Sequence, residues 1–245
     1  MTTLFGSTRT VVKERYALLT PDSFVPSTLP GWSNAVCIVN ISPVLGARFC
    51  QTLVTFGDNA QGRGHTGAGQ LFAYVMEGEA TIVIAGKKSP LATGSFCYVP
   101  PERGFQFTGA KGTRLLLFEK KYQPLEGQTP PQTIVGLAGD IAGQPFLGND
   151  AARLQVLLPD QPAFDMAVNI FTYQPGATLP FVESHVMEHG LLMLAGQGIY
   201  RLDADWHPVQ AGDAIWMASY CPQWFVAMGR TPASYIYYKD VNRAP

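Results

Sequence analysis

Three short blocks in the first half of the chain recur in the second half at one constant spacing. Gly78 and Gly196 lie 118 positions apart, and so do Gly94 and Gly212. A spacing shared by three blocks indicates the duplication of one unit, so the sequence predicts two copies of a single domain. The paired blocks are Glu77–Ile82 with Ala195–Tyr200, Thr93–Tyr98 with Ala211–Trp216, and Leu116–Lys121 with Ser234–Lys239.

Each copy consists of short apolar runs of strand length, such as Phe72–Met76, Ala80–Ala85 and Ser95–Val99. These runs are rich in β-branched and aromatic residues, and glycine, proline or charged residues end them. Long stretches with the 3.6-residue period of a helix are absent. The pattern predicts an all-β protein of the sandwich or barrel type, with few short helices. We expect the first domain at residues 1–122, a connection at 123–155 and the second domain at 156–245.

The composition narrows the class of protein and its partners. The 245 residues are ample for two hydrophobic cores, and 47% of them are apolar. A net charge of −1 does not favour nucleic acid, whose binding proteins usually carry a basic patch. The sequence contains no run of 18 apolar residues, so no membrane span is expected. Met1–Val12 does not resemble a secretory signal. The scattered cysteines indicate reduced thiols in a cytoplasmic protein; they are Cys37, Cys50, Cys97 and Cys221.

The stretch from Glu183 to Gly190 concentrates groups that bind metal ions. Glu183 and His185 are two residues apart, so on a strand both side chains point to one face. His189 follows after an interval that allows the chain to turn and return to that face. One carboxylate and two imidazoles suit Mn²⁺, Fe²⁺, Zn²⁺ or Ni²⁺. The alternative interpretation is a solvated polar edge, but the pattern Glu-x-His-x-x-x-His within a β-repeat favours a metal site.

The surrounding glycines resemble the two motifs of the cupin superfamily, G-x5-H-x-H-x3,4-E-x6-G and G-x5-P-x-G-x2-H-x3-N. Gly176 begins the first motif, and Gly196 follows His189 after six intervening residues. Gln223 stands eleven residues after Gly212, at the histidine position of the second motif. The donor set is therefore permuted to Glu, His, His and Gln. It leaves open positions on an octahedral ion, and its two oxygen donors favour Mn²⁺ over Zn²⁺.

The first repeat lacks this donor set. The positions 118 residues before Glu183, His185, His189 and Gln223 hold His65, Gly67, Leu71 and Phe105. Of these four residues, only His65 has a side chain of a metal-binding type. We therefore expect one metal ion per chain and a structural role for the first domain, and the sequence leaves open whether His65 has a role of its own.

Most of the chain resembles the (S)-ureidoglycine aminohydrolases, a family of two-barrel cupins (bicupins) with jelly-roll barrels. The metal motif and the tail block that ends in Arg243 are the most specific parts of the resemblance. The matching segments are Tyr16–Asp22, Phe164–Met166, Glu183–Gly190, Leu194–Gly198 and Tyr235–Arg243.

The resemblance implies an enzyme that uses Mn²⁺ to hydrolyse (S)-ureidoglycine to (S)-ureidoglycolate and ammonia, in purine (allantoin) catabolism. It also implies a homo-oligomer, an octamer in this family. The metal ligands that it implies are Glu183, His185, His189 and Gln223. The substrate-binding and catalytic residues that it implies are Tyr200, Tyr235, Lys239 and, again, Glu183.

Two other functions stay open at this point. One is a different metal-dependent cupin enzyme, either a dioxygenase or an isomerase, which the donor set alone does not exclude. The tail block with Tyr235 and Lys239 argues against it. The other is a bicupin without enzymatic activity that binds a small ligand or forms a storage assembly. The complete donor set in the second repeat argues against a purely structural protein.

Overall fold

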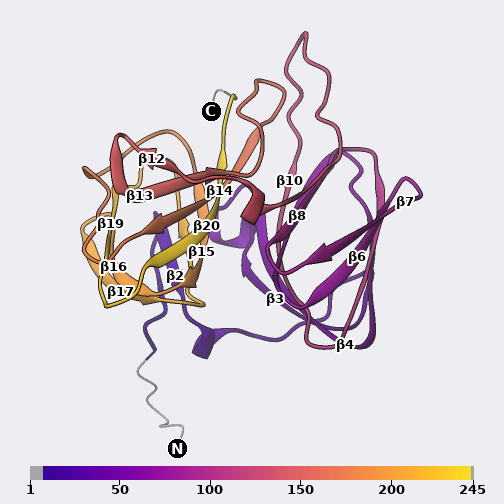
Figure 1. Cartoon of the computed structure of the whole chain (residues 1–245), viewed down its shortest axis with the longest axis horizontal. Helices are drawn as coiled ribbons and strands as arrows, with labels where there is room; N and C mark the ends of the chain where they lie inside the picture. The colour runs from indigo at the N-terminus through magenta and orange to yellow at the C-terminus, as the bar shows by residue number, and fades with distance from the viewer. Residues whose placement is uncertain (1–7, 244–245) are drawn as a thin grey trace, which may run out of the picture. The chain divides into compact units, whose positions relative to one another are not determined.

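The structure is a computed structural model that describes residues 8–243. It confirms the predicted all-β class (Figure 1). Within the described residues there are twenty strands and no α-helix, and the three 3₁₀ helices are η1 (Pro21–Ser23), η2 (Pro43–Leu45) and η3 (Ala138–Asp140). The chain forms two compact units, and each unit is described separately below.

The unit that contains most of the first repeat comprises Val25–Ala142, Leu157–Ala167 and the described residues after Asp240. Its nine-stranded sheet has the order β11-β8-β5-β10-β4-β9-β6-β7, and β3 pairs with β4. The sheet surrounds a core that includes the fully buried Val54, Phe107 and Leu115. Its strands are β3 (Trp32–Ile41), β4 (Cys50–His65), β5 (Gly69–Glu77), β6 (Glu79–Ile84), β7 (Lys87–Ala92), β8 (Ser95–Val99), β9 (Gly104–Gly109), β10 (Arg114–Lys121) and β11 (Ile134–Leu137).

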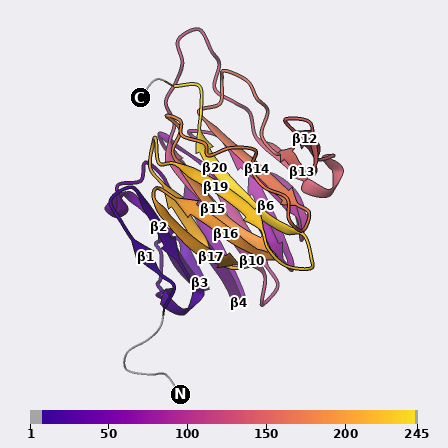
Figure 2. The ribbon, with the colours of Figure 1, turned by 90° about the vertical axis from the view of Figure 1, so that its left-hand side faces the viewer.

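The unit that contains most of the second repeat comprises the described residues up to Phe24, Gly143–Val156 and Val168–Asp240. An eight-stranded sheet has the order β1-β2-β18-β15-β20-β14-β13-β12, and a three-stranded sheet has the order β17-β16-β19. Figure 2 shows the later strands of this unit towards the viewer, in orange and yellow. The strands are β1 (Val11–Val12), β2 (Tyr16–Leu19), β12 (Gln144–Phe146), β13 (Asn149–Val156), β14 (Met166–Tyr173), β15 (His189–Ala195), β16 (Gln197–Leu202), β17 (Asp205–Gln210), β18 (Ala214–Met217), β19 (Gln223–Ala227) and β20 (Ala233–Asp240).

The strands repeat at the spacing found in the sequence. β6 and β16 begin and end 118 residues apart, and so do β7 and β17. Glycines with positive φ begin the corresponding turns, as at Gly78 (82°) and Gly196 (71°). A Cβ atom at Gly196 would lie 2.5 Å from the Pro232 carbonyl oxygen, so both the backbone angle and the space favour glycine there.

The N-terminal segment differs from the predicted boundaries, which placed residues 1–122 in one domain. β2 pairs with β18 from Ala214↔Leu19 to Met217↔Tyr16, within the unit of the second repeat. The Arg9 guanidinium donates two hydrogen bonds, of 2.6 and 2.8 Å, to the fully buried carboxylate of Asp213. The segment belongs there because its apolar face and its arginine complete the core of that unit. The predicted connection is divided in the same way, since β11 pairs with β8 while β13 pairs with β14.

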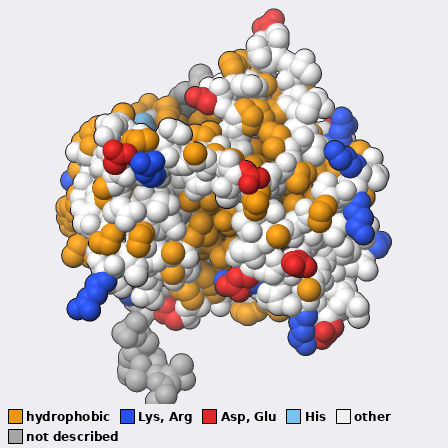
Figure 3. Space-filling model, viewed as in Figure 1, with side chains coloured by type: hydrophobic (Ala, Val, Ile, Leu, Met, Phe, Trp, Pro, Cys, Tyr) orange, Lys and Arg blue, Asp and Glu red, His pale blue; other side chains and the backbone are white. Residues whose placement is uncertain are grey.

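The surface carries both signs of charge. On the face in Figure 3, red carboxylate side chains and blue lysine and arginine side chains are dispersed among white and orange areas. Among the described residues, no helix is long and apolar enough to span a membrane.

Candidate metal centre

The four predicted metal donors come from four different local structures. Glu183 forms an isolated bridge with Gln223, His185 lies in an irregular segment, His189 begins β15 and Gln223 begins β19. The structure therefore differs from the expectation that Glu183 and His185 share a strand. The reason is that the chain leaves regular pairing between Tyr173 and His189, where bridges hold it only at single residues.

The donors nevertheless lie close to one another. The Nε2 atom of His185 lies 3.1 Å from Nε2 of Gln223 and 3.9 Å from Oε2 of Glu183. The rings of His185 and His189 have centroids 4.7 Å apart. The Tyr200 hydroxyl donates to Oε1 of Gln223 at 3.2 Å. Rotation of the amide by half a turn exchanges its two atoms, so its oxygen can face His185 instead.

Burial sets the protonation of the imidazoles. Burial and the positive charge of Lys239 lower the pKa of His185. Burial, His185 and Lys239 lower the pKa of His189 well below its usual value. Both rings are therefore neutral near pH 7 and have a lone pair to offer to a cation. Burial raises the pKa of Glu183, although Lys239 acts in the opposite direction.

The donor set fits a divalent ion although it has not converged into a tight shell. Neighbouring ligands about 2.1 Å from one ion lie about 3 Å apart, which is close to the separation of His185 and Gln223. The Nδ1 atoms of His185 and His189 are buried and have no hydrogen-bond partner within residues 8–243. Unpaired buried polar atoms are rare in folded proteins. In the described part of the chain, no three His, Cys, Asp or Glu side chains, Glu183, His185 and His189 included, are grouped closely enough to hold a metal ion.

A small cavity of about 20 Å³ lies against these donors. That volume holds about one water molecule. The cavity brings together most of the predicted site residues with four that the sequence analysis did not name. Its lining consists of Glu183, His189, Tyr200, Gln223 and Tyr235, which were predicted, and Phe171, Leu179, Leu191 and Tyr237, which were not.

Larger cavities of about 680 and 420 Å³ lie in the other unit, away from the donors. Volume alone would select them as binding sites. The 420 Å³ cavity is lined by one imidazole, one amide and one carboxylate (His65, Gln70 and Glu119), but by no second histidine. At the small cavity two imidazoles stand together, since the ring of His185 lies 4.7 Å from that of His189, so we assign the chemistry to the small cavity.

Tyrosines surround the cavity and are held by one another. The hydroxyl oxygens of Tyr173 and Tyr235 lie 3.0 Å apart, and Asn169 donates to the Tyr237 hydroxyl at 3.1 Å. Burial raises the pKa of Tyr200, Tyr235 and Tyr237, so these groups act as neutral hydroxyls. Side chains alternate between the two faces of β20, so Tyr237, two residues from Tyr235, shares its face. This alternation is the sequence signal that could have identified Tyr237.

Lys239 lies on β20 directly opposite His189 in the strand register. It is half-buried and does not line the small cavity. Its charge nevertheless acts on Glu183, His185 and His189. The lysine therefore gives this end of the sheet a positive potential.

Glu188, directly before β15, is only 2% exposed and anchors the end of the preceding segment. Its carboxylate accepts a hydrogen bond of 2.8 Å from the Trp216 indole, and its backbone N–H donates to the carboxylate of Asp240. A buried carboxylate is stable only when it is paired in this way. These contacts on β18 and β20 fix the position at which His189 enters β15.

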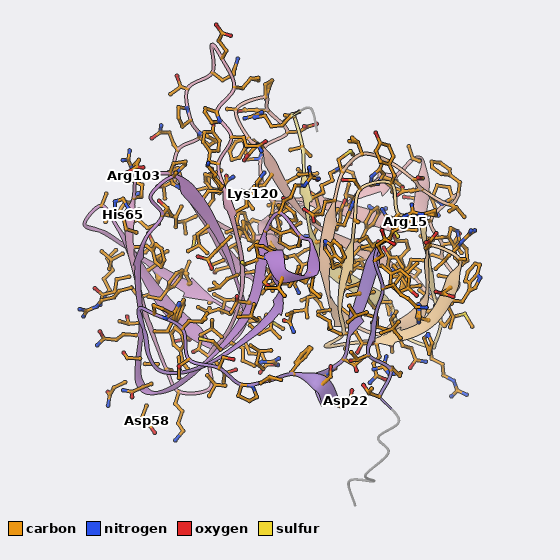
Figure 4. All side chains as sticks on the ribbon, turned by 180° about the vertical axis from the view of Figure 1, so that it is seen from behind. Arg15, Asp22, Asp58, His65, Arg103 and Lys120 are labelled. Carbon is orange, nitrogen blue, oxygen red and sulfur yellow. The ribbon has the colours of Figure 1, made fainter. Side chains whose placement is uncertain are left out.

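The corresponding end of the first repeat is built differently. His65 is the last residue of β4, and its Nδ1 atom accepts a hydrogen bond of 3.0 Å from the backbone of Gly67. Figure 4 shows it at the periphery near Arg103, whose carbonyl accepts from the Thr66 backbone. Lys120, also labelled there, lies deeper and pairs at 3.0 Å with the fully buried Asp165.

The chain is similar to known proteins over nearly its whole length. Residues 169–238 match the cupin domain family. The (S)-ureidoglycine aminohydrolase of Escherichia coli (strain K12) is 39% identical over 96% of this chain and 92% of its own length. The enzyme of that name from Arabidopsis thaliana is 38% identical over 98% of this chain and 80% of its own length. The crystal structure of protein Ylba from E. coli superposes with a TM-score of 0.88 and 34% identity, over 98% of this chain and 96% of that one.

Proposed function

The chain belongs to the (S)-ureidoglycine aminohydrolase family of bicupins, and from this premise we propose how its second repeat performs the reaction. The enzyme hydrolyses (S)-ureidoglycine to (S)-ureidoglycolate and ammonia, a step of purine catabolism. One observation carries the location of the site: the cavity that joins Glu183, His189 and Gln223 to the hydroxyls of Tyr200 and Tyr235. The 420 Å³ cavity of the first repeat is lined by His65, Gln70 and Glu119 but by no tyrosine.

Glu183, His185, His189 and Gln223 would hold one Mn²⁺ ion per chain. Two neutral imidazoles and two oxygen donors match the preferences of this ion. When bound, the ion supplies a positive charge that anchors the substrate carboxylate and polarises groups beside it. The isolated bridge between Glu183 and Gln223 fixes two of these donors through the backbone, independently of the ion.

The remaining groups bind the substrate and move protons. Lys239 attracts the substrate carboxylate and transfers a proton as ammonia leaves. The neutral hydroxyls of Tyr200 and Tyr235 form hydrogen bonds with polar atoms of the substrate. Glu183 orients the substrate amine or the attacking water. Because the cavity holds only about one water molecule, side chains around it must move apart when the substrate enters.

Assembly and location are further parts of the proposal. We expect the octamer that the family resemblance implies, with no nucleic-acid or membrane partner. A cytoplasmic location is supported by the four cysteines, which are all free thiols in the structure. Reduced thiols are typical of that compartment.

Parallel measurement of ammonia and oxygen separates the proposed reaction from the alternatives. The aminohydrolase should release ammonia from freshly generated (S)-ureidoglycine above the spontaneous rate, with no consumption of O₂. Oxygen consumption would indicate a dioxygenase. If the Mn²⁺-loaded protein binds the substrate but changes neither ammonia nor oxygen, it is a binding protein.

A further inference from the structure

The hydroxyl of Tyr237 accepts a hydrogen bond from Asn169, which directs the hydroxyl hydrogen away from that residue. Its oxygen accepts a hydrogen bond of 3.1 Å from Nδ2 of Asn169, which is 3% exposed and lies on the neighbouring strand β14. A hydroxyl has one hydrogen to donate, and Asn169 uses the oxygen, not the hydrogen. Within residues 8–243 we find no acceptor for that hydrogen.

The ring of Tyr237 is fixed on both faces. It stacks on His189 at a centroid distance of 5.6 Å and an interplanar angle of 18°, and on Phe171 at 5.9 Å and 15°. The residue is 7% exposed and lines the small cavity. The hydroxyl therefore cannot turn out to water, and a bound molecule is the natural acceptor of its hydrogen.

We propose that Tyr237 donates a hydrogen bond to the ureido carbonyl of the substrate and that Asn169 is the positioning residue that sets the direction of this bond. The inference rests on the site proposed above. A neutral donor matches the neutral carbonyl, whereas the substrate carboxylate is matched by the positive charge of Lys239 and of the ion. Tyr237 thereby selects substrates with a ureido group over simple 2-substituted acids.

Tyr237→Phe tests the donor, because it removes the hydroxyl and keeps the ring on His189. The probes are N-carbamoylglycine, a stable analogue that lacks the substrate amine, and glycolate, which lacks the ureido group. Binding to the full-length, Mn²⁺-loaded protein is measured by calorimetry. We expect N-carbamoylglycine to bind roughly 10- to 100-fold more weakly, with glycolate affinity and metal content unchanged. KM for (S)-ureidoglycine should rise by a similar factor.

Asn169→Asp tests the direction of the bond. A carboxylate at this position accepts the hydroxyl hydrogen and leaves only lone pairs towards the cavity. This variant should therefore weaken N-carbamoylglycine binding as much as Tyr237→Phe does, and the double variant should be no worse than either. Tyr98→Phe, which removes a buried hydroxyl that donates to Gln70 in the other unit, is the matched control and should bind both probes normally.

Different failures have different meanings. Unchanged N-carbamoylglycine binding in Tyr237→Phe would overturn the inference alone, as would an equal loss for glycolate. Normal binding in Asn169→Asp would show that Tyr237 already donates to residue 169, and would overturn it too. No binding to the unsubstituted protein, or binding unaffected by His185→Ala, would contradict the proposed site itself and the inference with it.

Discussion

Glu183 and Gln223 face each other across an isolated antiparallel bridge. Each backbone N–H donates to the carbonyl of the other residue, at 2.8 and 2.9 Å. Two donors from segments 40 residues apart are thus held by the main chain, whatever their side chains bind. Because the bridge involves only the main chain, it persists when the side chains are replaced. Side-chain substitutions therefore test metal binding without changing the fold of the site.

Gln223→Leu should lower the affinity for Mn²⁺ by at least about tenfold and leave the fold intact. The variant removes the amide donor while the backbone bridge to Glu183 remains. Equilibrium dialysis with Mn²⁺, together with circular dichroism, checks both expectations. Gln210→Leu, an exposed glutamine on β17, is the matched control. Unchanged Mn²⁺ affinity in Gln223→Leu would remove the amide from the donor set.

Lys239→Met should lower kcat by about 10²- to 10⁴-fold without loss of the metal, because it removes a proton-transfer group and no metal donor. Lys121→Met is the control, since Lys121 occupies the corresponding position of the first repeat, 118 residues earlier, and is exposed. Steady-state kinetics and metal analysis of both variants are required. Full turnover in Lys239→Met would show that the lysine moves no proton in the reaction.

Arg9→Met should lower the free energy of unfolding by about 1–3 kcal/mol, because it leaves the buried carboxylate of Asp213 without its cation. The expected loss in the free energy of unfolding is smaller than for a fully buried pair because the Arg9 side chain is 32% exposed. Urea denaturation measures the change. Lys111→Met breaks the exposed pair with Asp58 and should cost less than about 1 kcal/mol. Equal effects of the two variants would contradict the role of the N-terminal segment in this core.

The metal-free protein should lose stability as the pH falls below about 6.5. Burial lowers the pKa of His189 well below its usual value, so the unfolded chain binds a proton that the folded chain rejects. The stabilising contribution is therefore complete above the unfolded pKa and is lost on acidification, by up to about 1.4 kcal/mol per pH unit for one histidine. Urea denaturation between pH 7.5 and 5.5 should show a smaller slope for His189→Asn. Identical slopes would show that groups other than His189 cause the pH dependence of stability.

The sequence predicted those features that depend on local pattern and spacing. The 118-residue repeat anticipated the matching bounds of β6 and β16, because a duplicated unit keeps its turn glycines. The position of β2 beside β18 was not predicted, because long-range pairing leaves no periodic signal in a four-residue strand. The pairing of Arg9 with Asp213 was missed for the same reason.

The motif named the candidate donors of the site, whereas it did not name the residues that contact them. The motif names His189 but contains nothing about Asn169, which reaches Tyr237 only through the neighbouring strand β14. Tyr237 stands in a run of aromatic residues whose successive members face opposite sides of β20. Its role becomes visible only when its ring is found between His189 and Phe171.

The most direct test of the account is ammonia release from fresh (S)-ureidoglycine by metal-stripped protein, with and without added Mn²⁺. The substrate decays spontaneously, so each rate is corrected with a sample that lacks protein. We predict release that depends on Mn²⁺ and that is lost in His185→Ala, while the corresponding change in the first repeat, His65→Ala, leaves it intact. No release above the spontaneous rate from protein shown to hold Mn²⁺, or full release by His185→Ala, would contradict a manganese-dependent aminohydrolase site in the second repeat.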